Sequence, residues 1–256
     1  MSLPEVPDLP TMRPVPDPIF AQRRLAEVYD PLDPDRSDLD AYLAMVDEFA
    51  AESVLDIGCG TGTFACLLAA RGLAVTAVDP AQASLTVART KPGANRVRWI
   101  HGYLPDVRPL KVDLITMTAN VAQVFLTNQD WASTLRTAST LLGTGGRLIF
   151  ETRDPAARAW LEWTPDQSYK HQVIPGVGGV QAWVQVTDLS PPFVSFRWTF
   201  IFDADGARLT SDSMLRFRTR DEVTASLAAT GYLLNDVREA PDRPGHELVF
   251  IAHRAE

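Results

Sequence analysis

Residues 54–62 decide the fold, and they read Val-Leu-Asp-Ile-Gly-Cys-Gly-Thr-Gly. An apolar run that ends in glycines at alternate positions indicates a buried strand followed by a tight turn. Glycine lets the backbone turn sharply there, and it lets a ligand approach the main chain without meeting a Cβ atom. Residues 62–71 then show apolar side chains at helical spacing. The stretch therefore predicts a strand, a ligand-binding glycine loop and a helix.

Two acidic residues, Asp56 and Asp79, accompany this loop. Asp79 ends the next predicted strand, 74–78, where a carboxylate can accept hydrogen bonds from both hydroxyls of a ribose. Asp56 precedes the first glycine by two positions; its charge would repel a pyrophosphate but attract the ammonium group of a methionine moiety, directly or through water. This favours S-adenosylmethionine over NAD. The structural alternative is a turn that only joins strand to helix, with Asp56 and Asp79 as solvated caps.

Outward from the loop, strand-like and helix-like segments alternate. Strands are expected at 97–100, 112–117 and 147–151, and helices at 81–90, 131–142 and 221–230. Repeated strand-helix units with apolar strands predict a parallel sheet covered on both faces. The last two runs, 232–237 and 247–252, are separated by too few residues for a parallel crossover, which takes about a dozen. These two strands must be antiparallel if they pair.

Residues 180–217 break the alternation, with three β-like runs joined by turn-rich segments, which predicts an inserted antiparallel meander. The insertion is rich in aromatic residues, of which the last four share one face: Trp183, Phe193, Phe196, Trp198, Phe200 and Phe202. Trp160 and Trp163 precede it on a possible short helix. The aromatic face has three open roles, namely a roof over a substrate pocket, a subunit interface, or packing onto the core.

The N-terminal segment has a different character. Residues 1–18 contain six prolines and predict an extended arm. Two helices are expected at 19–29 and 38–50, separated by a turn-rich break at 30–34. We therefore expect an arm at 1–18 and a single domain at 19–256, with a helical cap over 19–50 and a β insertion at about 170–217.

Composition limits the partners. The formal net charge of -8 opposes nucleic-acid binding, so a small or neutral substrate is favoured. No run approaches the roughly 20 apolar residues that span a bilayer, so no membrane partner is expected and the predicted location is the cytoplasm. The spacing of Cys59 and Cys66 suits neither a disulfide framework nor a four-ligand zinc site, and no metal is expected. The predicted assembly is a monomer or a homodimer.

The segment from Asp56 to Gly62 resembles motif I of the class I S-adenosylmethionine-dependent methyltransferases, and the order of elements is similar from about Leu39 to the C-terminus. The resemblance implies an α/β fold, a doubly wound, seven-stranded, mostly parallel Rossmann-like methyltransferase sheet whose final strand is antiparallel, here with the inserted β meander. It also implies that Asp79 holds the ribose and that the glycine loop faces the methionine portion.

One departure concerns adenine. The family often has Gly-Asp after strand three, whereas this chain has His101, Gly102 and Tyr103. Adenine recognition is then left to backbone groups, to stacking by the Tyr103 ring, or to Asp106. In similar methyltransferases N-terminal helices close over the donor, which makes Tyr29 a candidate contact. The predicted cofactor-binding residues are Asp56, Gly58, Cys59, Gly60, Asp79, Pro80, Tyr103, Thr118 and Tyr29.

The acceptor side is expected just past strand four, because open α/β sheets bind ligands at the carboxyl ends of their strands. Thr118, Asn120 and Gln123 are polar residues in that position. Asn120 is the best candidate for touching donor or substrate; the alternative is an Asn that caps the next helix. Methyl transfer is an in-line displacement, so a strong base is not compulsory. Glu151 is selected as the catalytic acid–base residue from a wider set: His101, Glu151, Asp154, His171 and His246.

These observations predict an S-adenosylmethionine-dependent methyltransferase that acts on oxygen or nitrogen of a small molecule. The acceptor is expected beneath the aromatic insertion, between Tyr29, Asn120 and the loop after Glu151. The Asn/Asp-Pro-Pro-aromatic signature of amino-methyltransferases that act on bases or glutamine is missing after strand four. The alternatives are an NAD-dependent oxidoreductase and a catalytically silent S-adenosylmethionine-binding module.

Overall fold

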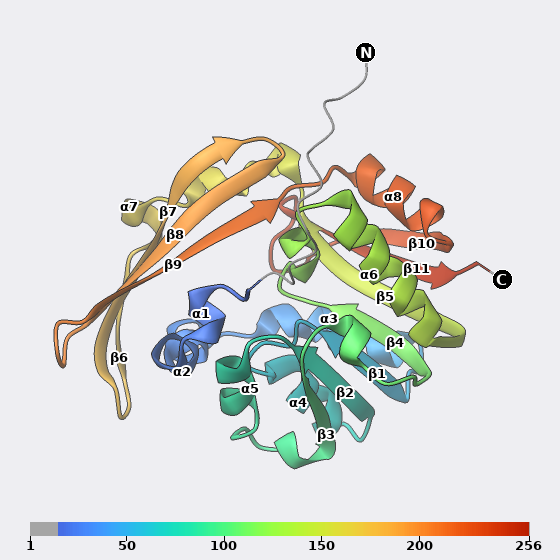
Figure 1. Cartoon of the computed structure of the whole chain (residues 1–256), viewed down its shortest axis with the longest axis horizontal. Helices are drawn as coiled ribbons and strands as arrows, with labels where there is room; N and C mark the ends of the chain where they lie inside the picture. Colours follow the sequence, from blue (N-terminus) through green and yellow to red (C-terminus); the bar gives the residue numbers. More distant parts are fainter. Residues whose placement is uncertain (1–14, 256) are drawn as a thin grey trace.

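A seven-stranded sheet forms the body of the molecule, and a four-stranded sheet stands beside it (Figure 1). The computed structural model describes residues 15–255, so most of the predicted arm 1–18 lies outside the described residues. The large sheet has the strand order β10-β11-β5-β4-β1-β2-β3. Its strands are β1 (Ser53–Ile57), β2 (Ala74–Asp79), β3 (Val97–His101), β4 (Val112–Met117), β5 (Leu142–Arg153), β10 (Tyr232–Glu239) and β11 (Glu247–Arg254).

The direction of the strands confirms the predicted fold class. The five strands from β3 to β5 are parallel, whereas β11 is antiparallel to both β5 and β10. The chain builds outward from β1 through β2 to β3, then returns to place β4 on the other side of β1. That reversal leaves a crevice outside the carboxyl ends of β1 and β4, which is where open α/β sheets bind ligands.

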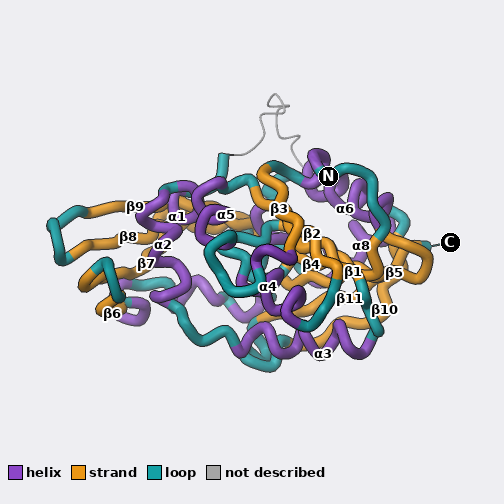
Figure 2. The backbone as a smooth tube through the Cα atoms, turned by 90° about the horizontal axis from the view of Figure 1, so that it is seen from below, coloured by secondary structure: helices purple, strands orange, loops and turns teal. Residues whose placement is uncertain are grey.

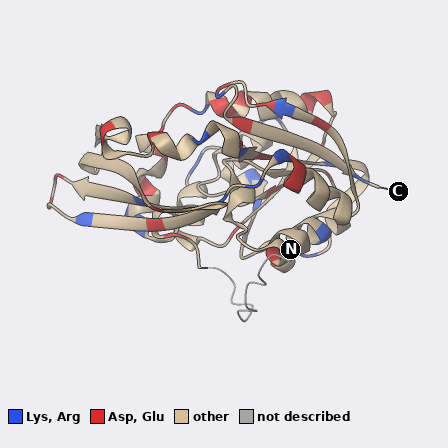
Figure 3. Ribbon diagram, turned by 90° about the horizontal axis from the view of Figure 1, so that it is seen from above, with Lys and Arg blue, Asp and Glu red and all other residues tan. Residues whose placement is uncertain are grey.

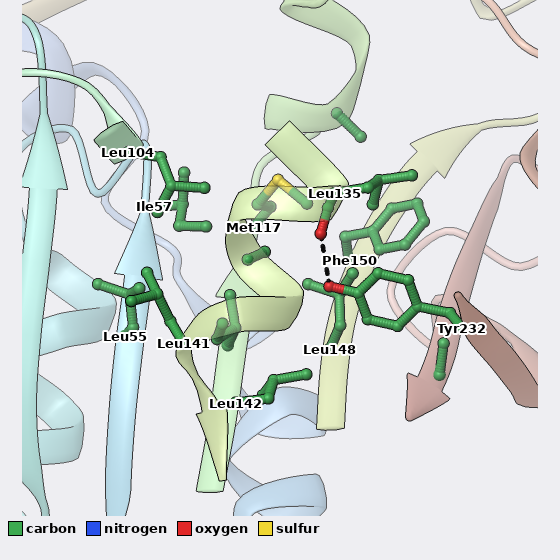
Figure 4. Close-up of a cluster of buried hydrophobic side chains, with 14 of the residues drawn as sticks. Leu55, Ile57, Leu104, Met117, Leu135, Leu141, Leu142, Leu148, Phe150 and Tyr232 are labelled. Carbon is green, nitrogen blue, oxygen red and sulfur yellow. Dashed lines mark hydrogen bonds between the residues drawn. The ribbon is translucent and has the colours of Figure 1, made fainter. Parts of the chain in front are cut away.

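Helices cover both faces of this sheet. On one face α6 (Asn128–Leu141) and α8 (Arg220–Ala229) bury Trp131, Leu135 and Leu227 against the strands. Figure 4 shows part of this cluster, in which the Tyr232 hydroxyl donates to the Leu135 carbonyl at 2.9 Å. On the other face α3 (Asp40–Glu48) and α4 (Thr63–Ala70) pack their apolar sides on β1, β4 and β5. Helix α5 (Gln82–Ala88) lies near β2 and β3.

The inserted sheet has the order β6-β7-β8-β9 and is antiparallel throughout. Its strands are β6 (Lys170–Ile174), β7 (Gly178–Ser190), β8 (Phe193–Phe202) and β9 (Arg208–Arg216), preceded by the short helix α7 (Pro165–Ser168). The sequence predicted three runs between 180 and 217, and the structure adds β6 as a fourth strand.

The N-terminal helices lie between the two sheets (Figures 1 and 2). α1 (Pro18–Ala21) and α2 (Arg23–Leu32) contact α5 on one side and the inserted sheet on the other. Phe200 and Phe202 of β8 are buried in a cluster with Leu25 and Val28 of α2. These two aromatic side chains therefore pack the insertion onto the cap, which is one of the three roles left open for the aromatic face.

Three local boundaries differ from those expected. The predicted break at 30–34 starts later, because α2 continues through Pro31 to Leu32; a proline in the last turn removes only one hydrogen bond. The second helix starts as a 3-10 turn, Ser37–Leu39. Strand β5 continues past its expected end at Glu151 to Arg153, because β11 extends the pairing by placing Glu247 opposite Arg153.

Charged residues of both signs are distributed over both sheets and the helices (Figure 3). Within residues 15–255, no helix is both long and apolar enough to cross a membrane. The same part of the chain contains no group of three or more His, Cys, Asp or Glu side chains placed to hold a metal ion.

Candidate active site

The glycine loop follows β1, and its three glycines differ in what they do. All three have positive φ angles, between 54° and 76°. A Cβ atom on Gly58 would lie 2.6 Å from Val121, and one on Gly62 would lie 2.5 Å from Trp99. A Cβ atom on Gly60 would meet nothing within 4 Å. Gly58 and Gly62 are thus required by packing, whereas Gly60 presents bare backbone to open space, as a ligand-binding loop needs.

Asp79 holds the loop in place at the end of β2. Its carboxylate accepts hydrogen bonds from the Gly60 N–H at 2.8 Å and from the Ala81 N–H at 2.7 Å. The side chain is 7% exposed, and burial raises its pKa. Pro80 forms the next turn, where its carbonyl lies 3.1 Å from Nε2 of His101. Asp79, the residue predicted to bind the ribose, is therefore joined by a direct hydrogen bond to the loop predicted to face the methionine portion.

Asp56 lies at the end of β1 beside β4 and is 1% exposed. Its Oδ1 accepts from the Thr116 hydroxyl at 2.9 Å. Burial raises the pKa of Asp56 to about 7, and the charge of Asp79 adds to the rise. Thr118, just past β4, is also buried. The structure thus places Asp56 and Thr118 at the carboxyl ends of two neighbouring strands, β1 and β4.

Cys59, in the glycine loop, is partly buried and carries a free thiol, as does Cys66. Burial raises the pKa of the Cys59 thiol well above its ordinary value, and the charges of Asp56 and Asp79 add to the rise. The thiol is therefore neutral, and Cys59 offers the site its backbone and a small apolar group rather than a nucleophile.

The cap is attached to the glycine loop through Asp30, near the end of α2. Its carboxylate accepts from the Thr61 hydroxyl at 2.7 Å and pairs with the Lys91 ammonium at 2.6 Å. Tyr29, the preceding residue, packs on Phe20 with ring centroids 5.5 Å apart. Burial raises the pKa of the Tyr29 hydroxyl. The cap thus contacts the predicted donor site directly.

Arg36, which follows α2, is a site residue that the sequence did not single out. It pairs with Asp38 at 3.0 Å. Its positive charge opposes the rise that burial causes in the pKa values of both Tyr29 and Asp56. A cation therefore lies near the end of β1, where the sequence signal was weak because one Arg in a polar loop is normally a surface residue.

The two side-chain candidates for adenine recognition share one turn after β3. The Tyr103 N–H donates to the Asp106 carboxylate at 2.9 Å. A Cβ atom on Gly102 would come within 2.6 Å of that carboxylate, so the glycine makes room for it. Asp106 lies at the end of a 3-10 turn, Leu104–Asp106. Tyr103 thus stays the predicted adenine contact, and Asp106 stays its alternative.

Asn120 lies just past β4, is 4% exposed, and has a left-handed backbone with φ at 60°. Its N–H donates to Oε1 of Glu151 at 3.0 Å, and its Nδ2 donates to Oε1 of Glu247 at 3.0 Å. The side chain makes no capping bond to the 3-10 helix Val121–Val124 that follows. The alternative role as a side-chain helix cap is therefore wrong, and the structure joins Asn120 to Glu151.

Glu151 is 6% exposed on the face of the sheet that α3 covers. It accepts hydrogen bonds from the Tyr42 hydroxyl and from the Asn120 N–H. Burial raises its pKa to about 7, and the negative charge of Glu247 adds to the rise. A carboxyl group with such a pKa can accept and return a proton near neutral pH.

Charged residues from β5, from β11 and from the turn before β11 complete this cluster. Arg153 lies 3.6 Å from Oε1 of Glu247 and donates to Oε1 of Gln123 at 3.0 Å. Arg243 donates to Glu247 at 3.0 Å. The Arg153 guanidinium also lies 5.4 Å from the ring of Trp163. Sequence patterns did not single out four of these residues, although one of them begins the strand that was expected to be antiparallel: Tyr42, Glu247, Arg153 and Arg243.

The other acid–base candidates make different contacts. Asp154 accepts from the Ala156 N–H at 2.8 Å and caps a 3-10 turn. His171 lies in the inserted sheet, 2.8 Å from Asp203. His101 is exposed beside Pro80, and His246 contributes its carbonyl to the Asp154 N–H at 2.8 Å. Among the described residues, these contacts do not bring any of the four to Glu151.

Proteins that are similar to this chain in sequence are methyltransferases. A protein-family model described as a methyltransferase domain matches residues 21–180. The ubiquinone biosynthesis O-methyltransferase of Idiomarina loihiensis is 29% identical over 142 residues, covering 49% of this chain and 56% of that protein. The chain thus spans about half the length of the curated relatives that it matches.

Two solved structures share the fold. The CcbJ methyltransferase of Streptomyces caelestis has a TM-score of 0.74 and 19% identity, covering 93% of this chain and 98% of that one. The sugar N-methyltransferase KedS8 of Streptoalloteichus has a TM-score of 0.71 and 18% identity, with both chains fully covered. These likenesses extend over the inserted sheet as well as the large one.

Proposed function

The chain belongs to the methyltransferase-domain family, and from that premise we propose that it binds S-adenosylmethionine and methylates an oxygen or nitrogen atom of a small molecule. One observation carries the proposal. The bare backbone of Gly60 faces open space and is hydrogen-bonded to Asp79, at the carboxyl edge of the sheet. A glycine loop joined to a carboxylate at the end of the second strand suits a nucleoside with a charged extension.

The residues of the loop fit this donor. Each oxygen of the Asp79 carboxylate accepts one backbone N–H and keeps a further acceptor position for a ribose hydroxyl. Asp56 provides negative charge for the ammonium group of the methionine portion, and Arg36 provides positive charge for its carboxylate. Cys59, Pro80, Thr118 and Tyr29 line the same edge, and the Tyr103 turn is assigned to adenine.

Bound S-adenosylmethionine supplies an electrophilic methyl group on a sulfonium. The chain has to orient the acceptor, exclude water and take a proton. Glu151 is the proposed proton acceptor, because its carboxylate is buried and its pKa of about 7 lies near neutral pH. Asn120, which contacts Glu151, is proposed to touch the acceptor. A small-molecule acceptor is supported by two similar proteins, an O-methyltransferase of ubiquinone biosynthesis and a sugar N-methyltransferase.

We propose several further properties from the sequence alone. A cytoplasmic location rests on the composition, as does the exclusion of nucleic-acid acceptors by the net charge of -8. On the same basis, we propose that the acceptor is enclosed beneath the inserted sheet and that the protein is a monomer or a homodimer. The proposed boundaries are 1–18 for the arm, 19–50 for the cap and about 170–217 for the β insertion.

Isothermal titration calorimetry with S-adenosylhomocysteine, the demethylated product, tests the donor. We expect saturable binding in the micromolar range and no binding of NAD. Binding of NAD without S-adenosylhomocysteine would place the chain among the oxidoreductases instead. Transfer of radiolabelled methyl groups to small molecules then separates an active enzyme from a silent binding module.

A further inference from the structure

The Oδ1 atom of Asn120 is a buried acceptor with no donor. Within residues 15–255 it is one of three buried side-chain polar atoms that make no hydrogen bond, and the other two belong to arginines. Buried polar atoms are nearly always paired, because an unpaired one loses its hydrogen bonds to water without replacement. An unpaired acceptor at the carboxyl end of β4 therefore indicates a donor that arrives with a ligand.

The identity of this atom follows from Glu247. A carboxylate only accepts hydrogen bonds, so the Asn120 atom that faces Glu247 at 3.0 Å has to be the amide nitrogen. Arg153 and Arg243 also direct their guanidinium groups to the same Glu247 oxygen, which holds that carboxylate in place. The amide cannot flip, and its oxygen stays on the side away from Glu247. Glu247 is thus a positioning residue for Asn120.

The backbone conformation at Ala119 and Asn120 is a second indication of a functional site. Ala119 and Asn120 both have left-handed conformations, with φ at 55° and 60°. Such angles are uncommon in residues other than glycine and persist where the surroundings impose them, often at functional sites. Here they direct the Asn120 N–H to Glu151 while its side chain reaches Glu247.

The two buried acidic residues beside Asn120, Glu247 and Glu151, differ in their partners. Glu247 is paired with two arginines, whereas the hydrogen bonds that Glu151 accepts come from neutral donors, the Tyr42 hydroxyl and the Asn120 N–H. Within the described chain, no nitrogen of Lys, Arg or His forms an ion pair with Glu151. The charge of Arg153 acts on Glu151 without a direct ion pair and opposes the rise in its pKa. The direct pairing position at this buried carboxylate is therefore left to a cation that a ligand can supply.

We propose that the methyl acceptor is a primary or secondary amine, which enters as its ammonium form, donates a hydrogen bond to Oδ1 of Asn120 and gives a proton to Glu151. The proposal rests on the proposed function and names the substrate class of the same site. One N–H proton moves to the Glu151 carboxylate, which frees the nitrogen lone pair. That pair forms the C–N bond as the C–S bond of the sulfonium breaks, so S-adenosylhomocysteine leaves and the positive charge stays on the methylated nitrogen.

The number of hydrogen atoms on the acceptor decides between amines and alcohols. After the proton transfer, a primary or secondary amine keeps at least one N–H for Asn120. A hydroxyl group has a single proton, which cannot be donated to Asn120 once Glu151 has taken it. A tertiary amine likewise has no N–H left in its reactive form. The geometry therefore points to methylation of nitrogen that ends at the tertiary amine.

Wild-type enzyme tests this with acceptor pairs that differ only in the reacting group: 2-phenylethylamine and 2-phenylethanol, cyclohexylamine and cyclohexanol, glucosamine and glucose. Transfer of tritium from S-[methyl-³H]adenosylmethionine is expected to be at least tenfold faster to the amines. Mass spectrometry should find mono- and dimethylated nitrogen. Equal or faster transfer to the alcohols, no transfer to any amine, or a quaternary ammonium product would overturn the proposal.

Asn120→Gly tests the contact itself, because glycine keeps the positive φ and the N–H that donates to Glu151. For the best amine we expect KM to rise at least tenfold, with the affinity for S-adenosylhomocysteine changed less than twofold. Asn95→Gly, on an exposed turn at the opposite edge of the sheet, is the matched control. An equal loss of S-adenosylhomocysteine affinity would show that Oδ1 contacts the methyl donor and not the acceptor, which would overturn the proposal. Failure of the wild type to bind S-adenosylhomocysteine at all would instead count against the proposed function.

Discussion

At the scale of single residues, the site is defined by carboxylates that the fold keeps out of water. Asp56, Asp79 and Glu151 are each less than a tenth exposed, and burial is the main cause of the raised pKa of each. A carboxyl group with a raised pKa binds protons more tightly in the folded state than in the unfolded state, so it destabilises the fold as pH rises. The site thus costs stability near neutral pH, which is common where catalytic groups are kept dry.

Replacement of Glu151 by Gln should reveal this cost. The pKa of Glu151 is about 7 in the folded protein against an ordinary value of 4.5, so the wild type loses stability as pH rises between these values. Gln does not ionise, so from pH 5 to pH 8 the variant should gain about 1 to 3 kcal/mol relative to wild type. Urea unfolding followed by tryptophan fluorescence at both pH values measures the difference. The exposed Glu162→Gln serves as control, and a pH-independent effect of Glu151→Gln would contradict the assignment.

Asp79→Ala should weaken the binding of S-adenosylhomocysteine by about 1.5 to 3 kcal/mol, because hydrogen bonds from two hydroxyls to a charged acceptor are lost. The change also frees the N–H groups of Gly60 and Ala81, so a small fall in thermal stability should accompany it. Calorimetry and thermal unfolding measure the two effects separately. Asp188→Ala, on the exposed part of β7, should leave both unchanged. Undiminished affinity would remove Asp79 from the donor site.

At the scale of elements, attachment of the cap depends on a few polar contacts. Asp30, near the end of α2, contacts Thr61 in the glycine loop and Lys91 just past α5. Ser84 of α5 donates to the Phe20 carbonyl at 2.9 Å. These bonds join the helix pair α1 and α2 to the glycine loop, to α5 and to the turn after α5, all more than 30 residues further along the chain. Movement of the cap should therefore be coupled to the glycine loop.

Asp30→Ala should release this coupling. We expect faster hydrogen–deuterium exchange across Arg23–Leu32 and a three- to tenfold weaker affinity for S-adenosylhomocysteine, which corresponds to about 1 kcal/mol for a partly buried ion pair with a hydrogen bond. Asp33→Ala removes a more exposed ion pair, with Lys170, from the same helix end and should have little effect. If both variants exchanged like the wild type, Asp30 would not hold the cap.

Elements with a strong local signal were predicted well. The strands around the glycine loop and the antiparallel final pair follow from apolar runs and from connection length, which are properties of neighbouring residues. The partners of Asn120 could not be found in this way. Glu247 is 127 residues away in sequence, and the contact depends on β11 pairing along the whole of β5. Tyr42 reaches Glu151 only because α3 covers that face of the sheet. Contacts set by packing leave little trace in local periodicity.

At the scale of the whole molecule, the cap and the inserted sheet share one apolar cluster. Phe202 is fully buried in it, and the Arg24 guanidinium lies 3.7 Å from the centre of its ring. Ile19 of α1 donates its N–H to the Ser211 hydroxyl of β9 at 2.9 Å. The insertion therefore supports the helices that contact the glycine loop. Substitutions that destabilise the insertion should weaken binding at the proposed donor site.

Phe202→Ala should lower the free energy of unfolding by about 3 to 5 kcal/mol, because it leaves a cavity beside Leu25 and Val28. Protection of α2 from hydrogen exchange should fall with it, and so should the affinity for S-adenosylhomocysteine. Urea unfolding, exchange and calorimetry are the three measurements. Val173→Ala, at a position 76% exposed on β6, is the control. A loss of stability with unchanged protection of α2 would show that the cap does not depend on the insertion.

The position of α2 between the two sheets also determines when it can fold during synthesis. Leu25 leaves the ribosome 177 residues before Phe202, its partner in the same cluster. At about 5 to 20 residues per second, the apolar side of α2 waits about 9 to 35 seconds for the strand that carries Phe202. The large sheet up to β5 emerges in that interval, so it can form around the glycine loop before the cap docks. A nascent chain stopped before β8 would therefore expose the apolar face of α2, which makes this helix a natural binding segment for chaperones.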